Sequence, residues 1–312
     1  MALALTGAAV GQEQAGMAQH QERLCAALEL CSKAPDGMRR LAASREAMSI
    51  LSSALETDGS ERWQWKLPRN ASVLTSPDRK LRVFSWAVVN DAGEYECFGA
   101  VQYYNDKEEA YSYELLADHS YEMLNREESL LGPDRWLGAI YQDLIQTTAG
   151  SRTYYTLLGW NGVDRMTDMR VIEPVSLQGG KVHFGAALFR RERNLRRVVI
   201  EYRDDAAVQM NYDEQTVQTV STERVKKDGR MRTVEKIKEH KERMIIFDEV
   251  EPQVEGMQGL FQYYVPSGLE LAYVWVDGKW ELRHGAQGRL TDKRLNKAFE
   301  PLQKSQPAYQ FN

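Results

Sequence analysis

Residues 153–189 read TYYTLLGWNGVDRMTDMRVIEPVSLQGGKVHFGAALF, and this segment decides the fold that we expect for the chain. It opens with an aromatic and aliphatic run on both faces of an extended chain, as in a strand buried on both sides. Asn161-Gly162 then favours a turn, and Gly179-Gly180 separates two further β-type runs, as in a hairpin. With an upstream run, the segment predicts an antiparallel meander of four strands. We expect these strands at residues 137–148, 153–160, 170–177 and 181–189.

The alternation of apolar and polar residues extends through most of the chain. The predicted fold class is therefore mainly β: a many-stranded antiparallel meander, arranged as a sandwich, a barrel or a small propeller-like structure, with an N-terminal helical pair. Asp277-Gly278 is the strongest hairpin signal, and Asp204-Asp205 marks another. Further strands are expected at residues 62–66, 72–74, 81–89, 94–104, 109–115, 197–202, 207–212, 244–247, 260–265, 269–276 and 279–282.

Composition divides the chain into four parts. We expect a possible signal-peptide remnant at residues 1–14, the helical pair at 15–58, the antiparallel β domain at 59–284 and a polar tail at 285–312. Pro35 ends the first helix and Asp36 caps the second. The N-terminal part is small and apolar before it turns polar, as at the end of a signal peptide, but it lacks the usual positive charge. A simple small-residue tail is the alternative.

A charged insertion interrupts the β domain at residues 221–243. It holds nine Lys and Arg and five Asp and Glu around a central Asp228-Gly229. The pattern is typical of a long solvated hairpin or of a partly disordered insertion.

Charge and cysteine content exclude some classes of partner and site. The net charge of −5 and the pI near 5.7 give no attraction to nucleic acid, so we expect no such partner. Three cysteines cannot all pair in one chain, and Cys25 and Cys31 lie too far apart along a helix to form a disulfide. No apolar run is long enough to span a membrane, so we expect a soluble protein.

Three motifs give the chain a resemblance to other proteins. They are SPDRKLRVFSW at residues 76–86, TYYTLLGWNG at 153–162 and YVWVDGKWEL at 273–282. With them, the chain resembles a family of uncharacterised exported, periplasmic or secreted, bacterial β-rich proteins with SPDxKxRxxSW and YYxLLGWDG-like elements in the same order, over about residues 41–282. The resemblance implies export but no activity. The Asp that usually follows Gly-Trp in that family is Asn161 here, so any metal or catalytic role of that acid would be lost.

Aromatic residues at the ends of strands are the first candidates for a ligand-binding surface. Trp86, Trp160 and Trp275 each precede a turn, and Asn161 and Asp164 follow the second of them. Aromatic rings near turns are candidates for ligand stacking. Asn161, Asp164 and Asp168 are oxygen ligands around a glycine, so a calcium loop is conceivable, but they lack the usual spacing of one. Packing at the ends of strands, and capping of turns, is the competing explanation for each of these residues.

Five arginines crowd the sequence FRRERNLRR: Arg190, Arg191, Arg193, Arg196 and Arg197. Together with the charged insertion they are candidates for a polyanion-binding face. The alternative is a solvated loop whose arginines pair with the abundant carboxylates.

No local motif assigns an enzymatic mechanism or a cofactor. The histidines are isolated, and phosphate-loop, dinucleotide and nucleophile-elbow motifs do not occur, so we predict no metal and no cofactor, and the catalytic residues, if any, stay unknown. Asp118-His119-Ser120 places an acid, a base and a hydroxyl side by side, which chance explains better than a triad. Glu94, Glu96 and Asp143 lie near aromatic strands, but no sequence feature selects a pair.

These observations favour a non-catalytic, exported binding or envelope-associated protein in the periplasm or outside the cell, with envelope components or glycans as partners. A cytoplasmic location is the alternative to export. The alternative function is a hydrolase of envelope polymers or glycans that uses scattered carboxylates. A deep cleft with two converging carboxylates of raised pKa would favour the hydrolase.

Overall fold

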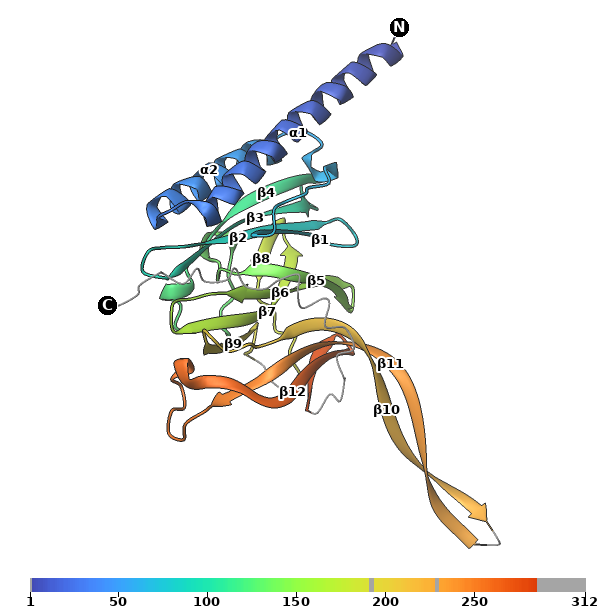
Figure 1. Ribbon diagram of the computed structural model, residues 1–312. Helices are drawn as coiled ribbons and strands as arrows, with labels where there is room; N and C mark the ends of the chain where they lie inside the picture. The colour runs from blue at the N-terminus through green and yellow to red at the C-terminus, as the bar shows by residue number, and fades with distance from the viewer. Residues whose placement is uncertain (1, 191–193, 228–229, 285–312) are drawn as a thin grey trace, which may run out of the picture.

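The computed structural model describes residues 2–190, 194–227 and 230–284. Strands make up 48% of the chain and helices 21%, which confirms the predicted mainly β class. The strands form three antiparallel sheets, and none of the described strands closes a sheet into a barrel. The sheets lie one above another (Figure 1), so of the predicted arrangements the sandwich comes nearest.

Each sheet is built from strands that are neighbours in sequence. The first has the order β1 (Ala71–Thr75), β2 (Leu81–Val89), β3 (Tyr95–Asn105) and β4 (Ala110–Ala117). The second has the order β5 (Ile140–Ala149), β6 (Arg152–Asn161), β7 (Thr167–Gln178) and β8 (Lys181–Phe184), and β9 (Val198–Arg203) also pairs with β7. The third has the order β10 (Met210–Lys227), β11 (Arg230–Pro252), β12 (Tyr264–Val276) and β13 (Lys279–His284).

Two helices, α1 (Ala2–Lys33) and α2 (Gly37–Leu55), cover the outer face of the first sheet (Figure 1). They run antiparallel, and Asp36 caps α2 as predicted, since its carboxylate accepts a hydrogen bond from the Arg39 amide at 2.8 Å. α1 begins at Ala2 rather than near residue 15. The interpretation of residues 1–14 as a signal-peptide remnant stays a prediction. In the described part of the chain, neither helix is both long and apolar enough to cross a membrane.

Strand β2 is buried on both faces because its alternating residues serve two different cores. Leu81 and Val83 point into the cluster between the first and second sheets. Phe84 and Trp86 point the other way, into the cluster under the helices. Successive side chains of a strand point to opposite faces of the sheet, so one strand can contribute to two hydrophobic layers.

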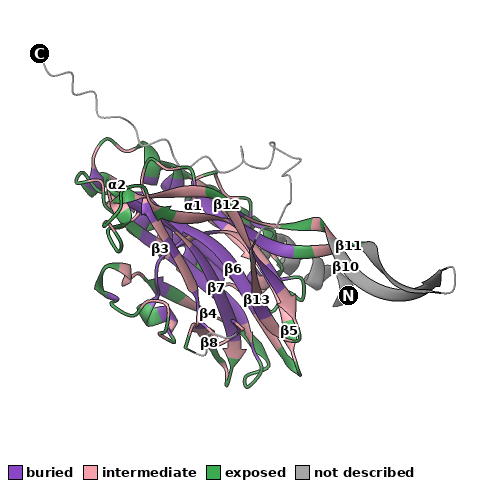
Figure 2. Cartoon of the chain, turned by 90° about the horizontal axis from the view of Figure 1, so that it is seen from below, coloured by how far each residue is buried: buried purple, intermediate pink, exposed green. Residues whose placement is uncertain are grey.

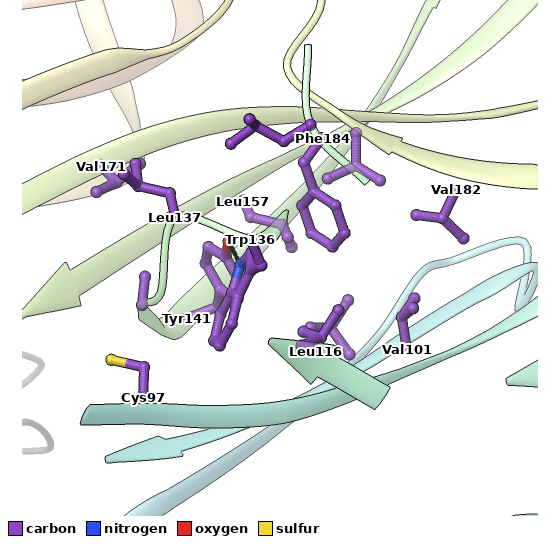
Figure 3. Close-up of a cluster of buried hydrophobic side chains, with 14 of the residues drawn as sticks. Cys97, Val101, Leu116, Trp136, Leu137, Tyr141, Leu157, Val171, Val182 and Phe184 are labelled. Atoms are coloured by element: carbon purple, nitrogen blue, oxygen red, sulfur yellow. Dashed lines mark hydrogen bonds between the residues drawn. The ribbon is translucent and has the colours of Figure 1, made fainter. Parts of the chain in front are cut away.

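The second sheet lies in the middle of the molecule. Leu157 packs toward the first sheet, beside Trp136 and Tyr141, as Figure 3 shows. Leu158, one residue later, packs toward the third sheet. The burial of both faces runs along β6 and β7 (Figure 2). The prediction that residues 153–160 form a doubly buried strand is therefore confirmed, as is the meander of β5 to β8.

The turns of the meander also follow the sequence. Gly179 and Gly180 have φ of 64° and 74° and join β7 to β8 in a two-residue hairpin, a conformation that glycine adopts without strain. Asp277 and Gly278, with φ of 50° and 77°, join β12 to β13 in the same way.

Three predicted strands form differently. Residues 62–66 do not pair as a strand, because the side-chain oxygen of Gln21 accepts both the Trp63 indole and the Lys66 amide and ties this segment to α1. Residues 260–265 and 269–276 were predicted as two strands, but most of them merge into β12. The merging is possible because β11 opposite shifts register between Asp248 and Val250, which absorbs the irregular backbone.

The predicted hairpin of residues 197–202 with 207–212 is wrong. β9 pairs with β7, whereas β10 pairs with β11 of the third sheet. Val208 and Met210 pack in the core between the second and third sheets, so the chain crosses from one layer to the next after Asp204-Asp205 instead of folding back.

The charged insertion is a hairpin, as one of the two predicted interpretations held. β10 and β11 pair continuously from Met210 with Phe247 to Lys227 with Arg230. The turn itself, at residues 228–229, lies outside the described residues. The outer part of this ribbon leaves the body of the molecule (Figure 1), and we call residues 214–227 and 230–243 the arm.

Candidate functional site

An open cavity of about 870 Å³ lies where four segments meet at one end of the first two sheets. These segments are the start of α2, the turn between β2 and β3, the loop that follows β4 and the loop between β6 and β7. Its polar lining residues include Asp91, Glu94, Glu96, Asp118, Asp164 and Arg126, and its apolar and aromatic ones include Met38, Leu41, Val88, Tyr95, Tyr121 and Met169. We call it the acidic cavity.

The turn between β2 and β3 is fixed by its own polar side chains. Asn90 accepts a hydrogen bond from the Glu94 amide at 3.0 Å and donates one to the Glu94 carboxylate at 2.7 Å. Asp91 reaches across to α2, where it accepts from the Gly37 amide at 2.7 Å and pairs with Arg40 at 3.0 Å. An acid at a helix N-terminus is favoured by the helix dipole. The turn and the helix therefore form one rigid wall.

Asp118 forms a second wall. One carboxylate oxygen accepts from the Cys97 amide at 2.8 Å and the other from the Ser120 amide at 2.9 Å. Burial raises the pKa of this carboxyl even though both hydrogen bonds favour its charged form. A Cβ on Gly138, whose φ is 72°, would lie 2.4 Å from an Asp118 oxygen, so only glycine fits there. His119 pairs with Glu122 at 3.0 Å rather than with Asp118, so these adjacent residues make no triad.

Glu96 differs from the other acids of the cavity. Its carboxylate forms no hydrogen bond or ion pair with a described residue, and it lies on β3 within electrostatic reach of Asp118 and, with opposite effect on its pKa, of Arg45. Partial burial, and then the charge of Asp118, raise the pKa of Glu96. The cavity thus combines two acids with raised pKa values: Asp118 is fixed by backbone amides, and Glu96 has no hydrogen bond to a described residue.

Large apolar side chains stand exposed on the same segments. Met38 is 82% exposed and Tyr121 81%, and both line the cavity. Leu124 is 96% exposed on the loop after β4, and Met166 is 55% exposed on the loop between β6 and β7. Exposed apolar groups gathered around a concave polar site are typical of binding surfaces.

The three tryptophans predicted as ligand contacts lie in separate places. Trp86 is buried under the helices, where its indole donates to the Ser44 hydroxyl at 2.8 Å. Trp160 packs edge-on against Tyr95, with ring centroids 5.4 Å apart, and so supports the cavity from behind. Trp275 is partly buried against Trp280 in the third sheet.

Asn161 and Asp164, the two polar candidates, shape the loop between β6 and β7. Asn161 is buried, accepts from the Val163 amide and donates to the Gly138 carbonyl. Asp164 lines the cavity, and one of its oxygens accepts from the amides of Met166 and Thr167. Of the five residues predicted as one site, the structure therefore brings only Asp164 to the cavity surface.

The predicted arginine cluster is divided between several roles. Arg190 pairs with Asp277 and Glu281 of the β12–β13 hairpin. Arg197 is completely buried and pairs with Glu173 at 2.7 Å. Arg196 is partly buried. Arg191 and Arg193 lie outside the described residues.

A second, smaller cavity of about 380 Å³ lies beside residues 62–65 and has basic and aromatic walls. Its buried cation, Arg82, already donates to Thr75, Gln102 and backbone carbonyls. The acidic cavity is larger, and the Glu96 carboxylate in it accepts no hydrogen bond from a described residue, so it is the stronger candidate. In the described part of the chain, no three His, Cys, Asp or Glu side chains gather closely enough to hold a metal ion.

Glu94, Glu96 and Asp118 appear in the sequence as separate candidates and not as parts of one site. The signal that connects them is weak: acids stand at the turns NDAGEYE (residues 90–96) and DHSYE (residues 118–122), and no lysine or arginine interrupts either. A scan against protein-family models found no match, and searches of curated proteins and of solved structures found none either. The geometry of the acidic cavity is therefore the basis on which a function is assigned.

Proposed function

We propose that the chain is a binding protein and that its acidic cavity takes a ligand that is both cationic and partly apolar, such as a basic segment of another protein. The observation that carries this proposal is the balance of charge. Five carboxylate residues line the cavity, whereas Arg126 is the one cation among its described lining residues and is already paired with Glu201 at 3.1 Å. A concave surface lined by one sign of charge attracts ligands of the opposite sign.

The acids divide the work of such a site. Asp91, Asp118 and Asp164 accept hydrogen bonds from backbone amides and hold the loops in shape. Glu96 has no such bond to a described residue, so its charge is available to a bound cation. A site whose frame is fixed before binding loses less entropy when the ligand arrives.

The apolar rim of the cavity would favour a ligand that also carries apolar groups. Met38 and Tyr121 offer flexible and aromatic surface beside the acids. Methionine adapts to varied shapes, and tyrosine stacks on the guanidinium of arginine. A segment that alternates basic and apolar residues would satisfy both parts of the surface.

Binding of short fluorescent peptides, measured by polarisation, tests the proposal. An arginine- and methionine-rich peptide should bind, a matched peptide with glutamate in place of arginine should not, and salt should weaken the complex. Glu96→Lys should reduce affinity by about tenfold or more, as reversal of a charge at a binding site does. Glu46→Lys, at an exposed residue of α2 that does not line the cavity, is the matched control. Equal affinity of both peptides would reject the proposal.

We further propose that this binding takes place in the bacterial envelope. The support is the small apolar N-terminal segment and the resemblance to exported proteins at residues 76–86, 153–162 and 273–282. The N-terminal sequence and cell fraction of the native protein test it. A mature chain that starts near Gln12 outside the cytoplasm is expected, and a cytoplasmic chain that keeps Met1 would reject export.

A hydrolase acting on envelope polymers or glycans is the second candidate. It is favoured by one observation, the raised pKa values of Glu96 and Asp118 in a shared cavity, since a general acid must hold its proton near neutral pH. Both Asp118 oxygens, however, are engaged by backbone amides, which fits a structural role better. Product release from polysaccharide or peptidoglycan fragments that stops with Glu96→Gln would establish the hydrolase.

A further inference from the structure

The arm formed by β10 and β11 is built in an unusual way. Residues 214–227 pair with residues 230–243, and β12 joins β11 only from Met244 onward, so among the described strands the arm has two members. At roughly 3.3 Å per residue, its fourteen pairs extend about 45 Å. A two-stranded ribbon is marginally stable alone in water. An arm of this length is therefore expected to gain stability from a surface that it contacts.

The sequence of the arm shows what kind of surface that is. Residues 224–232 read RVKKDGRMR, with five basic residues, one acid and two apolar residues, Val225 and Met231. The whole chain, in contrast, carries a net charge of −5. The end of the arm is thus a basic, partly apolar segment, which is the class of ligand that the acidic cavity suits.

The arm and the cavity of one molecule face different directions. The start of α2, one wall of the cavity, lies at the left in Figure 1, whereas the arm leaves the third sheet at the right and points away. An arm that occupies an acidic cavity must therefore come from another molecule.

We propose that residues 224–232 of one copy dock in the acidic cavity of a second copy. This inference rests on the proposed function and names the partner for it. Charge complementarity carries it: the sequence of residues 224–232 is basic and partly apolar, whereas the cavity is lined by five carboxylate residues and has an apolar rim that includes Met38 and Tyr121. Because each copy offers one arm and one cavity on different sides, the contact is head-to-tail and joins copies into open chains or closed rings.

Two charge reversals in the full-length protein test the inference. Lys226→Glu with Lys227→Glu removes the arm's charge and leaves the cavity intact, and Glu96→Lys does the opposite. In sedimentation at low salt, the mass of the wild type should grow with concentration and fall as salt is added, while either variant alone should associate at least about tenfold more weakly.

Mixing the two variants gives the sharpest result. The intact cavity of the arm variant can take the intact arm of the cavity variant, so a one-to-one dimer that does not grow further is expected. Glu46→Lys should associate as the wild type does. A wild type that stays monomeric at every concentration, or variants that associate as strongly as it does, would overturn the inference.

The outcome also separates this inference from the proposed function. If unrelated basic peptides bind the cavity but the full-length chain stays monomeric, the arm is not the ligand and the cavity keeps its proposed function. If the chain associates through its arm, no basic peptide binds, and Glu96→Lys changes nothing, both the proposed function and the docking inference fail.

Discussion

Two carboxylates show how differently this chain treats buried charge. Glu173 lies inside the second sheet, wholly buried, and meets Arg197 at 2.7 Å. Asp118 lies at the acidic cavity, where two backbone amides hold it and no described Lys or Arg forms an ion pair with it. Burial raises the pKa of both carboxyl groups. The main cause that lowers the pKa is the charge of Arg197 for Glu173, and hydrogen bonds from backbone amides for Asp118. The interior of the sheets thus neutralises its charge, whereas the cavity leaves negative charge in excess.

Of the changes considered, removal of Arg197 should have the largest effect, a loss of stability, because it takes away the cation that neutralises Glu173. Arg197→Met leaves Glu173 buried and unpaired, and the loss of one partner of a buried pair typically costs about 3–5 kcal/mol in the free energy of unfolding. Arg197 also donates to the carbonyl oxygens of Phe184 and Arg126, so loop contacts are lost as well. Urea unfolding measures the effect.

The pH dependence of that variant has a definite sign. Without Arg197, the folded-state pKa of Glu173 lies further above its unfolded value, so stability is greatest below the unfolded pKa and declines as pH rises through the folded pKa. Glu173→Leu with Arg197→Met should recover much of the loss, because an apolar pair replaces the ion pair. Equal losses in the single and double variants would show that the ion pair is not the cause.

Gly138→Ala should displace Asp118, the carboxylate at the cavity. A Cβ there would lie 2.4 Å from an Asp118 oxygen, on a backbone with φ of 72°. Strain of this kind costs about 1–3 kcal/mol. Unfolding and peptide binding should both weaken, because the carboxylate must move. Gly16→Ala is the control: it meets no atom within 4 Å in α1 and should gain up to about 1 kcal/mol. Unchanged stability in Gly138→Ala would show that the wall tolerates the shift.

The affinity of the cavity for a basic peptide should rise with pH, whereas the stability of the Arg197→Met variant should fall. Glu96 and Asp118 both have raised pKa values, so they gain charge at higher pH than ordinary carboxyls. Binding should therefore strengthen several-fold as pH rises through the acid range, measured by titration calorimetry. Glu96→Gln should flatten the dependence, whereas Glu46→Gln should leave it unchanged. A flat profile in the wild type would exclude these acids from the binding site.

The smallest effect expected is on stability in Glu96→Gln. The folded state raises the pKa of Glu96, so the wild type loses stability as pH rises through that value, and a neutral amide does not. At neutral pH the variant should gain no more than about 0.5 kcal/mol, because water screens an exposed carboxylate. The gain should vanish below the ordinary carboxyl pKa. Thermal unfolding at two pH values measures it, and a loss at neutral pH would contradict the raised pKa of Glu96, which comes from partial burial and then from the charge of Asp118.

The sequence predicted the parts of the fold that local patterns determine. Gly179-Gly180 and Asp277-Gly278 place their hairpins because turn conformation depends on two adjacent residues. The prediction of a hairpin around Asp204-Asp205 was wrong because two apolar runs joined by a polar turn are compatible with either a hairpin or a crossing between layers. The choice was made by the core that Val208 and Met210 enter.

The acidic cavity could not be predicted from local sequence patterns, because it also depends on how the layers pack. Gly37, Asp91, Asp118 and Asp164 come from four segments that only the stacking of helices and two sheets brings together. Their acids also cap turns and helix ends, so each has a local explanation that hides the shared one. The tryptophans show the opposite case: Trp86 stands out in the sequence, but its side chain is buried in the core.

The middle position of the second sheet has a consequence for how the molecule opens. Its strands β6 and β7 are covered by apolar layers on both faces and by neighbouring strands along both edges. Their amide protons can meet solvent deuterium only when an entire layer detaches, so they should exchange at the rate of global unfolding. The arm, paired only to itself, should exchange far faster. The same chain thus holds its slowest and fastest strands fewer than forty residues apart.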